Sequence, residues 1–362
     1  MQSPSRRVFA AIALIAVAAA ARPLHIHASD SDDAVSSTTR EQPGWLPTRT
    51  QLEEMLVAFD VPGLAFAGLV DCSVTPVIAV GAATLDPTTY VTDTTVFEAA
   101  SLSKPIFAYL VMQLVDEGVL DLDRPLARDF AYARIDNAAN YAQITPRMIL
   151  AHQTGLPNWV GDTDIPDRND PIAFVAPPGT QFSYSGEAYE LLRNYVEFRT
   201  GRSLTDLFRE RLGHIMPDST FAFPLPAGTT PSRGYTSTRE PTGERNLSNL
   251  GGAAGGLLTT AADYARFLEL ICSGQGLSET AYRAMLTPQS PVPPGQFPAP
   301  TSWALGWAVM GTGSATTILH GGDNGKYRSI AAIFPHERGG MVVLTNGRNG
   351  GDLIEALIAA LE

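Results

Sequence analysis

Hydrophobic residues recur every three to four positions in several stretches of the chain, a spacing typical of helices with one buried face. Residues 48–59 show this period, and the following Val61-Pro62-Gly63 predicts the end of a helix. The period returns over residues 106–118 and stops at Gly118, which predicts a buried helix opened by Ser101. Further helices are predicted at residues 188–201, at 204–215 and from Thr260, where a capping-box pattern begins, to about Cys272.

Short apolar runs of strand length lie on both sides of this helical middle. Residues 64–70 and 77–80 flank a turn that contains Pro76 and predict a β-hairpin buried on at least one face. Late in the chain, strands are predicted at residues 303–310, 315–319, 327–334 and 340–345, before a closing helix at about 352–361. Early and late strands with helices between them predict an α+β fold, in which the first strands pair with the last and a helical region is inserted.

Composition narrows the kind of partner. With 362 residues and 44% hydrophobic content, the chain can bury a large core in one or two domains. The net charge of −12 argues against nucleic acid, because a protein that binds phosphates needs a basic surface. We therefore expect a small-molecule partner.

The N-terminus has the features of an export signal. Arg6-Arg7 precede the apolar run Val8–Ala21, which is too short to span a bilayer comfortably, and a polar stretch follows. Ser5–Phe9 also resembles a twin-arginine signal. We expect a signal peptide at residues 1–28 and an exported, periplasmic or secreted protein with no stable membrane span after its removal; an anchored protein is the alternative.

The remaining chain divides by composition and pattern. Residues 29–44 are polar and rich in Ser, Thr and Asp, which predicts a disordered lead. One folded domain is expected at 45–360, with sheet parts at about 45–100 and 303–360 and a helical part at about 120–300. Cys72 and Cys272 are the only cysteines, and the sequence leaves open whether they form a disulfide or two buried thiols. No cluster with metal-ligand spacing occurs, so we predict no metal and no cofactor.

The strongest candidate for chemistry is Ser101 with Lys104. At helical spacing the two side chains share a face, so the amine can reach the hydroxyl. Lysine and arginine total 25, and only Lys104 and Lys326 are lysines. A desolvated lysine can become a neutral base, whereas arginine keeps its proton, so a lysine retained here indicates a nucleophile beside its base. The alternative is a serine that merely caps a helix.

Two other stretches could supply partners for the serine. Tyr184 stands in a short loop before a helix, and His320-Gly-Gly-Asp323 follows an apolar strand, where glycines let a backbone approach a substrate. Taken singly, the first is also explained by packing and the second by a turn. No Gly-x-Ser-x-Gly elbow or phosphate-binding glycine loop occurs. His152 is interpreted as a structural, hydrogen-bonding residue in a helix end and turn, and Lys326 as surface charge.

The order of these motifs resembles the serine β-lactamase and penicillin-binding protein superfamily. The resemblance covers roughly residues 45–360, and its nearest branch is the class C β-lactamase-related hydrolases, which include esterases and D-aminopeptidases. The motifs are Phe97–Pro105, Leu150–Pro157, Tyr184-Ser185, Gly255–Thr260, Leu305-Gly306-Trp307 and His320-Gly321-Gly322. The resemblance implies an antiparallel sheet flanked by helices beside a helical domain.

The resemblance also implies roles for individual residues. Ser101 matches the acylated nucleophile, Lys104 its base, and Tyr184 the tyrosine that carries protons to the leaving group. His320-Gly321-Gly322 matches the substrate strand, so the backbone N–H groups of Ser101 and Asp323 are expected to form the oxyanion hole.

The sequence departs from the motif pattern at two positions. Gly186 stands where the motif has an asparagine that holds the substrate amide, and His320 stands where β-lactamases and transpeptidases have lysine. We therefore expect a serine hydrolase acting on a small ester, amide or β-lactam, with esters favoured over β-lactams. The alternatives are a true β-lactamase or D-amino-acid peptidase, and a binding module that has lost turnover.

Overall fold

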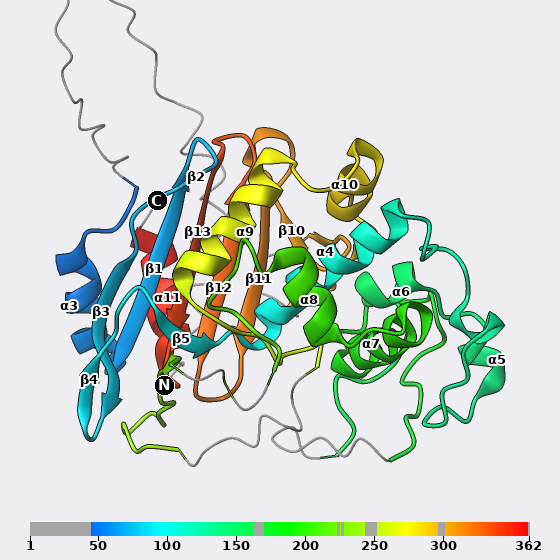
Figure 1. Ribbon diagram of the computed structural model, residues 1–362, viewed down its shortest axis with the longest axis horizontal. Coiled ribbons are helices and arrows are strands. Elements are labelled where there is room, and N and C mark those ends of the chain that lie inside the picture. The colour runs from blue at the N-terminus through cyan, green and yellow to red at the C-terminus, as the bar shows by residue number, and fades with distance from the viewer. Residues whose placement is uncertain are drawn as a thin grey trace, which may run out of the picture.

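The computed structural model describes residues 45–161, 170–222, 225, 228–242, 252–295 and 301–360. The predicted signal peptide and lead lie outside these residues. Figure 1 shows a twisted sheet on one side of the molecule and a group of helices on the other, with α4 (Ser103–Asp116) between them. This is the predicted α+β arrangement, and the sheet is antiparallel, as the resemblance implied.

The main sheet joins strands from the two ends of the chain. β1 (Gly63–Val70) pairs with β13 (Gly339–Thr345), so Leu64 lies opposite Thr345. This pairing confirms that the first strands meet the last. In order across the sheet the strands are β4 (Thr88–Tyr90), β3 (Ile78–Leu85), β1, β13, β12 (Arg328–Phe334), β11 (Thr317–Asp323), β10 (Ala308–Met310), β9 (Ser302–Trp303) and β8 (Ser290–Pro291), while β2 (Ser73–Val74) pairs with β1.

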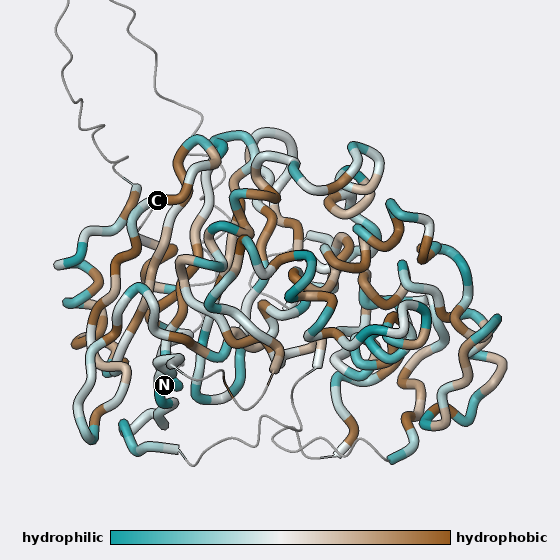
Figure 2. Tube along the Cα trace, viewed as in Figure 1, coloured by the Kyte–Doolittle hydropathy of each residue, from teal (hydrophilic) through white to brown (hydrophobic). Residues whose placement is uncertain are grey.

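Strand β1 is buried on both faces, in agreement with the prediction of at least one buried face. Its side chains alternate between two cores, as the two-residue period of a strand requires. Ala65, Ala67 and Leu69 belong to the larger core, which contains α4 and α9 (Ala261–Ser273). Leu64 and Phe66 pack with α3 (Arg49–Phe59) and α11 (Gly350–Ala360) on the other face. Figure 2 shows the hydrophobic stretches gathered in these strands and the adjoining helices.

Helix α4 is enclosed by protein on all sides. Each residue from Ser103 to Met112 is buried, and the neighbours of the helix come from both the sheet side and the helical part. The other helical elements are η1 (Ala100–Leu102), η2 (Leu126–Arg128), α5 (Ala138–Tyr141), α6 (Pro146–Leu150), α7 (Gly186–Thr200), α8 (Leu204–Leu212), α10 (Glu279–Leu286) and η4 (Gly313–Ala315). A small second sheet joins β6 (Thr230–Pro231), β5 (Thr95–Glu98) and β7 (Leu258–Thr259).

The prediction of one strand at residues 303–310 was wrong. The chain reverses there, and β9 and β10 form an antiparallel pair. Gly306 makes the reversal with φ +88°, and a Cβ at this glycine would come within 2.5 Å of the Ala108 side chain in α4. Apolar composition could not distinguish a long strand from a tight hairpin pressed against a helix.

The strand predicted at residues 315–319 was displaced. β11 begins at Thr317 and runs through Asp323, so His320-Gly321-Gly322 lies inside the strand and does not follow it. The glycines do not end the strand, because six consecutive pairs with β12, from Ile318 to Asp323, keep it in register. At the glycines the ladder is supplied by β12 alone, because β10 pairs only with Thr317–Leu319.

A disulfide joins Cys72, beside β2, to Cys272 near the end of α9, across a sequence separation of 200. The question that the sequence left open is thus answered in favour of a bond.

Helix α9 begins as predicted: the Thr260 side chain accepts a hydrogen bond from the Asp263 N–H at 3.1 Å. The Asp263 carboxylate accepts from the Asp218 N–H and the Ser219 hydroxyl, so it ties a distant loop to the start of the helix.

Within the described part of the chain, none of the helices combines the length and the apolar character needed to span a membrane.

Candidate active site

Ser101 lies in the short 3₁₀ turn η1 that leads from β5 into α4. The preceding Ala100 has φ +51°, a left-handed backbone that non-glycine residues seldom adopt and that often occurs at functional turns. Ser103 fixes this turn: its hydroxyl donates to the Ala100 carbonyl at 2.6 Å and accepts from the Leu257 N–H at 2.9 Å. The hydrogen bonds of Ser103 therefore hold the turn rigid, while Ser101 itself remains partly exposed.

Lys104 reaches the serine as predicted. Its Nζ lies 3.1 Å from Ser101 Oγ and donates to the Ala254 carbonyl at 2.6 Å. The side chain is 1% exposed. Burial lowers the pKa of Lys104 to about 7, because an ammonium loses hydration in this environment, although the charge of Glu190 acts in the opposite direction. The amine can therefore be neutral near physiological pH.

Tyr184 completes a cluster around the serine. Its hydroxyl is hydrogen-bonded with Ser101, and Lys104 Nζ lies 4.8 Å from the centre of its ring. Desolvation raises the pKa of Tyr184 well above its ordinary value, so the phenol keeps its proton. Of the two groups beside Ser101, only the amine loses its proton near neutral pH.

His152 holds the loop that carries this tyrosine. Its carbonyl accepts from the Ser183 N–H at 2.7 Å and its Nδ1 from the Ser185 N–H at 3.1 Å, so both neighbours of Tyr184 are fixed. Its ring centre lies 4.2 Å from that of Tyr184. The backbone of His152 has φ +54°, just after α6. The prediction of a hydrogen-bonding residue in a helix end and turn is confirmed.

His320 approaches the same cluster from β11. Its ring centre lies 6.3 Å from that of Tyr184 and 5.3 Å from that of Trp303. The imidazole is 1% exposed, and its Nδ1 is 2.7 Å from the Gly321 carbonyl. Burial, with a smaller contribution from Lys104, lowers the pKa of His320 to about 3. At neutral pH the ring is therefore uncharged.

The two glycines of β11 differ in their surroundings. A Cβ at Gly322 would come within 2.6 Å of the Ala99 carbonyl oxygen, so this glycine lets the strand lie directly against the nucleophile turn. A Cβ at Gly321 would meet no atom closer than 4.0 Å. Asp323 ends the strand, pairs with Arg328 and accepts from the Gly325 N–H at 2.7 Å. An oxyanion hole formed by the backbone N–H groups of Ser101 and Asp323 stays a prediction.

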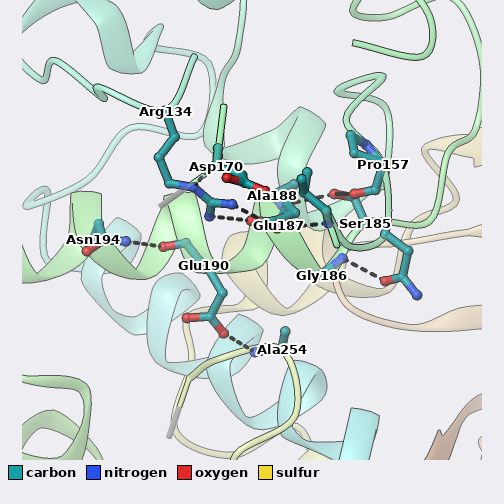
Figure 3. Close-up of polar contacts among 12 residues, drawn as sticks. Arg134, Pro157, Asp170, Ser185, Gly186, Glu187, Ala188, Glu190, Asn194 and Ala254 are labelled. Atoms are coloured by element: carbon teal, nitrogen blue, oxygen red, sulfur yellow. Dashed lines mark hydrogen bonds and ion pairs between the residues drawn. The ribbon is translucent and has the colours of Figure 1, made fainter. Parts of the chain in front are cut away.

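Gly186, the first residue of α7, has no room for a side chain. A Cβ there would lie 2.4–2.7 Å from the Trp159 indole. The backbone N–H of Gly186 donates to the Asn158 side-chain oxygen at 3.0 Å, which is the dashed line drawn at Gly186 in Figure 3. Sequence reasoning missed Trp159. It lies 27 positions upstream of Gly186, and nothing in the local pattern connects the two.

Sequence reasoning also missed Ala254, because a backbone carbonyl that holds a lysine has no side-chain signature. Lys326, expected to be surface charge, is partly buried. No group of three or more His, Cys, Asp or Glu side chains within the described ranges could hold a metal ion.

The chain is similar in sequence to known proteins. The family model described as beta-lactamase matches residues 50–362. Penicillin-binding protein 4 of Amycolatopsis lactamdurans is 28% identical over 312 residues, which are 79% of this chain and 81% of that protein. The unguisins hydrolase of Aspergillus campestris is 26% identical over 316 residues, 78% of this chain and 58% of that protein.

Solved structures share the fold. The crystal structure of SurE is 26% identical with a TM-score of 0.72, covering 86% of this chain and 74% of that one. D-amino acid amidase from Ochrobactrum anthropi SV3, complexed with D-phenylalanine, is 22% identical with a TM-score of 0.71, covering 86% and 97%. A class C beta-lactamase is 20% identical with a TM-score of 0.69, covering 86% and 94%.

Proposed function

The chain belongs to the beta-lactamase family, whose relatives are serine hydrolases that act through an acyl-enzyme, and on this premise we propose that it hydrolyses an uncharged ester or amide on Ser101. Ser101, Lys104 and Tyr184 are the residues proposed to carry the reaction. Their mutual contacts speak against a binding module that has lost turnover.

In the proposed mechanism, Lys104 in its free-base form takes the proton of Ser101 as the hydroxyl oxygen attacks the substrate carbonyl. The developing oxyanion is stabilised by the backbone N–H groups of Ser101 and Asp323. Tyr184 gives its proton to the leaving alcohol or amine and regains one from the Lys104 ammonium. Water then attacks the acyl-enzyme and loses a proton to the same pair. The Ser101 oxygen takes that proton back as it leaves, which releases the acid and the free serine.

The observation that carries the substrate class is the buried imidazole of His320, which is 1% exposed and faces the Tyr184 ring from β11. β-Lactams bear a carboxylate, and a lysine at this position would offer it a positive charge. Burial keeps the pKa of His320 near 3, so the ring offers no such charge at neutral pH. An ester or amide without a carboxylate loses nothing by this. Trp159 supports the same class, because its indole occupies the space that an amide-binding side chain at position 186 would need.

The test is a direct comparison of substrates. Intact-mass spectrometry after exposure to a fluorophosphonate, a penicillin and a short-chain aryl ester shows whether Ser101 reacts and which acyl group it keeps. We expect kcat/KM for the ester to exceed that for the penicillin, and His320→Lys to reduce the difference. Efficient penicillin turnover by the wild-type protein would contradict the proposal.

A D-amino-acid amide or peptide is the second candidate substrate. It is favoured by the named relatives, which include a penicillin-binding protein and, at the level of fold, a D-amino acid amidase. D- and L-phenylalanine amides, assayed beside the aryl ester, decide between the two candidates. Turnover of the D-amide alone would favour this second substrate class.

We also propose that the protein is exported, on the basis of Arg6-Arg7 and the apolar run that follows. Fusing residues 1–44 to a reporter that is active only outside the cytoplasm tests this. Replacing both arginines by lysine distinguishes a twin-arginine signal, which would fail, from a general one, which would tolerate the change.

A further inference from the structure

The second hydrogen bond of Lys104 leads to a carboxylate behind the site. Its amine donates to the Ala254 carbonyl, and the N–H of the same Ala254 donates to Glu190 Oε1 at 3.1 Å. We propose that Glu190 is a positioning residue for Lys104: it binds the N–H of Ala254, the residue whose carbonyl holds the amine, and it places a negative charge behind that amine. This inference rests on the proposed role of Lys104 as the base.

Glu190 is held in this position by its burial and by close packing against Gly252. It lies in the second turn of α7, is 5% exposed, and its side chain points from the helix toward Ala254 (Figure 3). The Glu190 carboxylate packs closely against Gly252, because a Cβ at position 252 would come within 1.9 Å of Glu190 Oε1. Only glycine at position 252 leaves room for the carboxylate so close to the backbone.

The segment from Ala254 to Leu257 is fixed at both ends, and the lysine contact is at the Ala254 end. At its far end, Leu257 accepts from the Ala99 N–H at 2.9 Å and donates to the Ser103 hydroxyl, so it is tied to the nucleophile turn. At its near end, the tie to Glu190 links it to α7. Losing Glu190 would leave the Ala254 carbonyl held from one side only. The amine would then lose its fixed place 3.1 Å from Ser101 Oγ.

The charge of Glu190 acts on the same amine. Several groups face Lys104: Ser101, Tyr184, Tyr189, His152, His320 and, through Ala254, Glu190. Burial keeps the two tyrosines protonated and both imidazoles neutral, because it raises the pKa of each tyrosine and lowers the pKa of each histidine. Glu190 favours the charged form of Lys104, so it opposes the effect of burial on the lysine pKa.

Glu190 has charged neighbours of its own. Arg193 donates to it at 2.8 Å and also binds Glu197, so its negative charge is partly compensated. Tyr132, Arg134, Glu187 and Asn194 line the same small cavity. Glu187 offers a matched control: it is 1% exposed on the same helix, but its carboxylate pairs with Arg134 and accepts from the Val160 N–H.

The experiment compares Glu190→Gln, Glu190→Ala and Glu187→Gln with the wild type. The rate at which a fluorophosphonate labels Ser101 is measured from pH 5 to pH 9, with the site of labelling checked by mass. Glutamine keeps an oxygen for the Ala254 N–H and removes the charge, whereas alanine removes both.

For Glu190→Gln we expect the plateau rate at alkaline pH to stay within about threefold of wild type, while the midpoint of the acid limb moves to lower pH by about 0.5 unit or more. For Glu190→Ala we expect the plateau to fall by roughly tenfold or more, a loss that glutamine rescues. Glu187→Gln should leave the midpoint unchanged.

Two results would overturn the inference: a Glu190→Gln profile that overlays the wild type, or an equal midpoint shift in Glu187→Gln. If the alanine variant does not fold, the glutamine profile decides alone. If the wild-type Ser101 is not labelled at any pH, the proposed function fails and the inference fails with it. Normal labelling with an unchanged Glu190→Gln midpoint removes only the inference.

Discussion

At the scale of single residues, the site depends on a lysine that can lose its proton. The amine lies 3.1 Å from Ser101 Oγ in a buried position, and burial lowers its pKa to about 7. We expect Lys104→Arg to reduce acylation of Ser101 by more than tenfold, a barrier increase above ~1.4 kcal/mol, because guanidinium cannot accept the proton. Rapid-mixing kinetics with an aryl ester measures this. Lys326→Arg, at the only other lysine, is the matched control, and a Lys104→Arg variant with a tenth or more of wild-type rate would refute the base assignment.

Tyr184 can be tested through its hydroxyl alone. Phenylalanine preserves the ring that packs 4.2 Å from the His152 ring, so the fold should survive. If the phenol transfers protons, Tyr184→Phe should reduce kcat by roughly 10²- to 10⁴-fold. Steady-state assays with an ester and an amide measure the loss. Unchanged kinetics on both substrates would make Tyr184 a packing residue.

Gly186 is constrained by packing as well as by chemistry. Because a Cβ there would lie 2.4 Å from Trp159, Gly186→Asn should destabilise the fold by about 1–3 kcal/mol without improving penicillin turnover. Adding Trp159→Ala should restore stability and allow any gain in penicillin turnover to appear. Thermal unfolding and kcat/KM are measured on both variants. A stable single variant would mean that Trp159 moves aside readily.

At the scale of elements, the disulfide fastens α9 to the hairpin beside β2. It closes a loop of 200 residues, for which the chain-entropy model gives a stabilisation of roughly 5 kcal/mol. We expect a reductant to lower the Tm of the wild type. The Cys72→Ala/Cys272→Ala double variant should have a lower Tm than the oxidised wild type, and a reductant should not change that Tm. Calorimetry with and without reductant checks this. Equal Tm values for oxidised and reduced wild type would show that the bond adds no stability.

At the scale of the whole molecule, buried groups that are neutral in the fold set how stability depends on pH. The unfolded Lys104 has a pKa of about 10.5 and the folded one about 7, so between these values the unfolded state binds more protons. Stability should therefore rise with pH above 7. Between about pH 3 and pH 6.5, His320 likewise makes stability rise with pH, because its pKa is lowered to about 3 in the folded state. Asp263 partly opposes this rise, because burial raises its pKa to about 6.

We expect a higher Tm at pH 9 than at pH 7 for the wild type, and a smaller difference for Lys104→Met, which has no amine to titrate. Calorimetry at the two pH values measures both proteins. A wild-type Tm that falls between pH 7 and pH 9, with the same fall in Lys104→Met, would show that Lys104 does not control this dependence.

The sequence by itself determined several of the helices and the first pair of site residues, Ser101 and Lys104. Helical period and caps located α3, α4 and α9 within a few residues, since these signals act between neighbours three or four positions apart. The contact of Ser101 with Lys104 has the same short range. The roles of Tyr184 and His320 were predicted from the order of the motifs, because their spacing along the chain does not show that they lie near Ser101.

Tertiary structure decided every feature that joins distant parts of the chain. The amine of Lys104 bonds a carbonyl 150 positions away, and Ala254 in turn bonds Glu190 across 64 positions. The pairing of Cys72 with Cys272, the Trp159 indole over Gly186 and the reversal at Gly306 are of the same kind. Such contacts depend on which surfaces pack together. A periodic sequence pattern shows that one face of an element is apolar, but it does not show which other element covers that face. The lowered pKa values of Lys104 and His320 follow from that packing, because desolvation arises only when the surrounding protein excludes water.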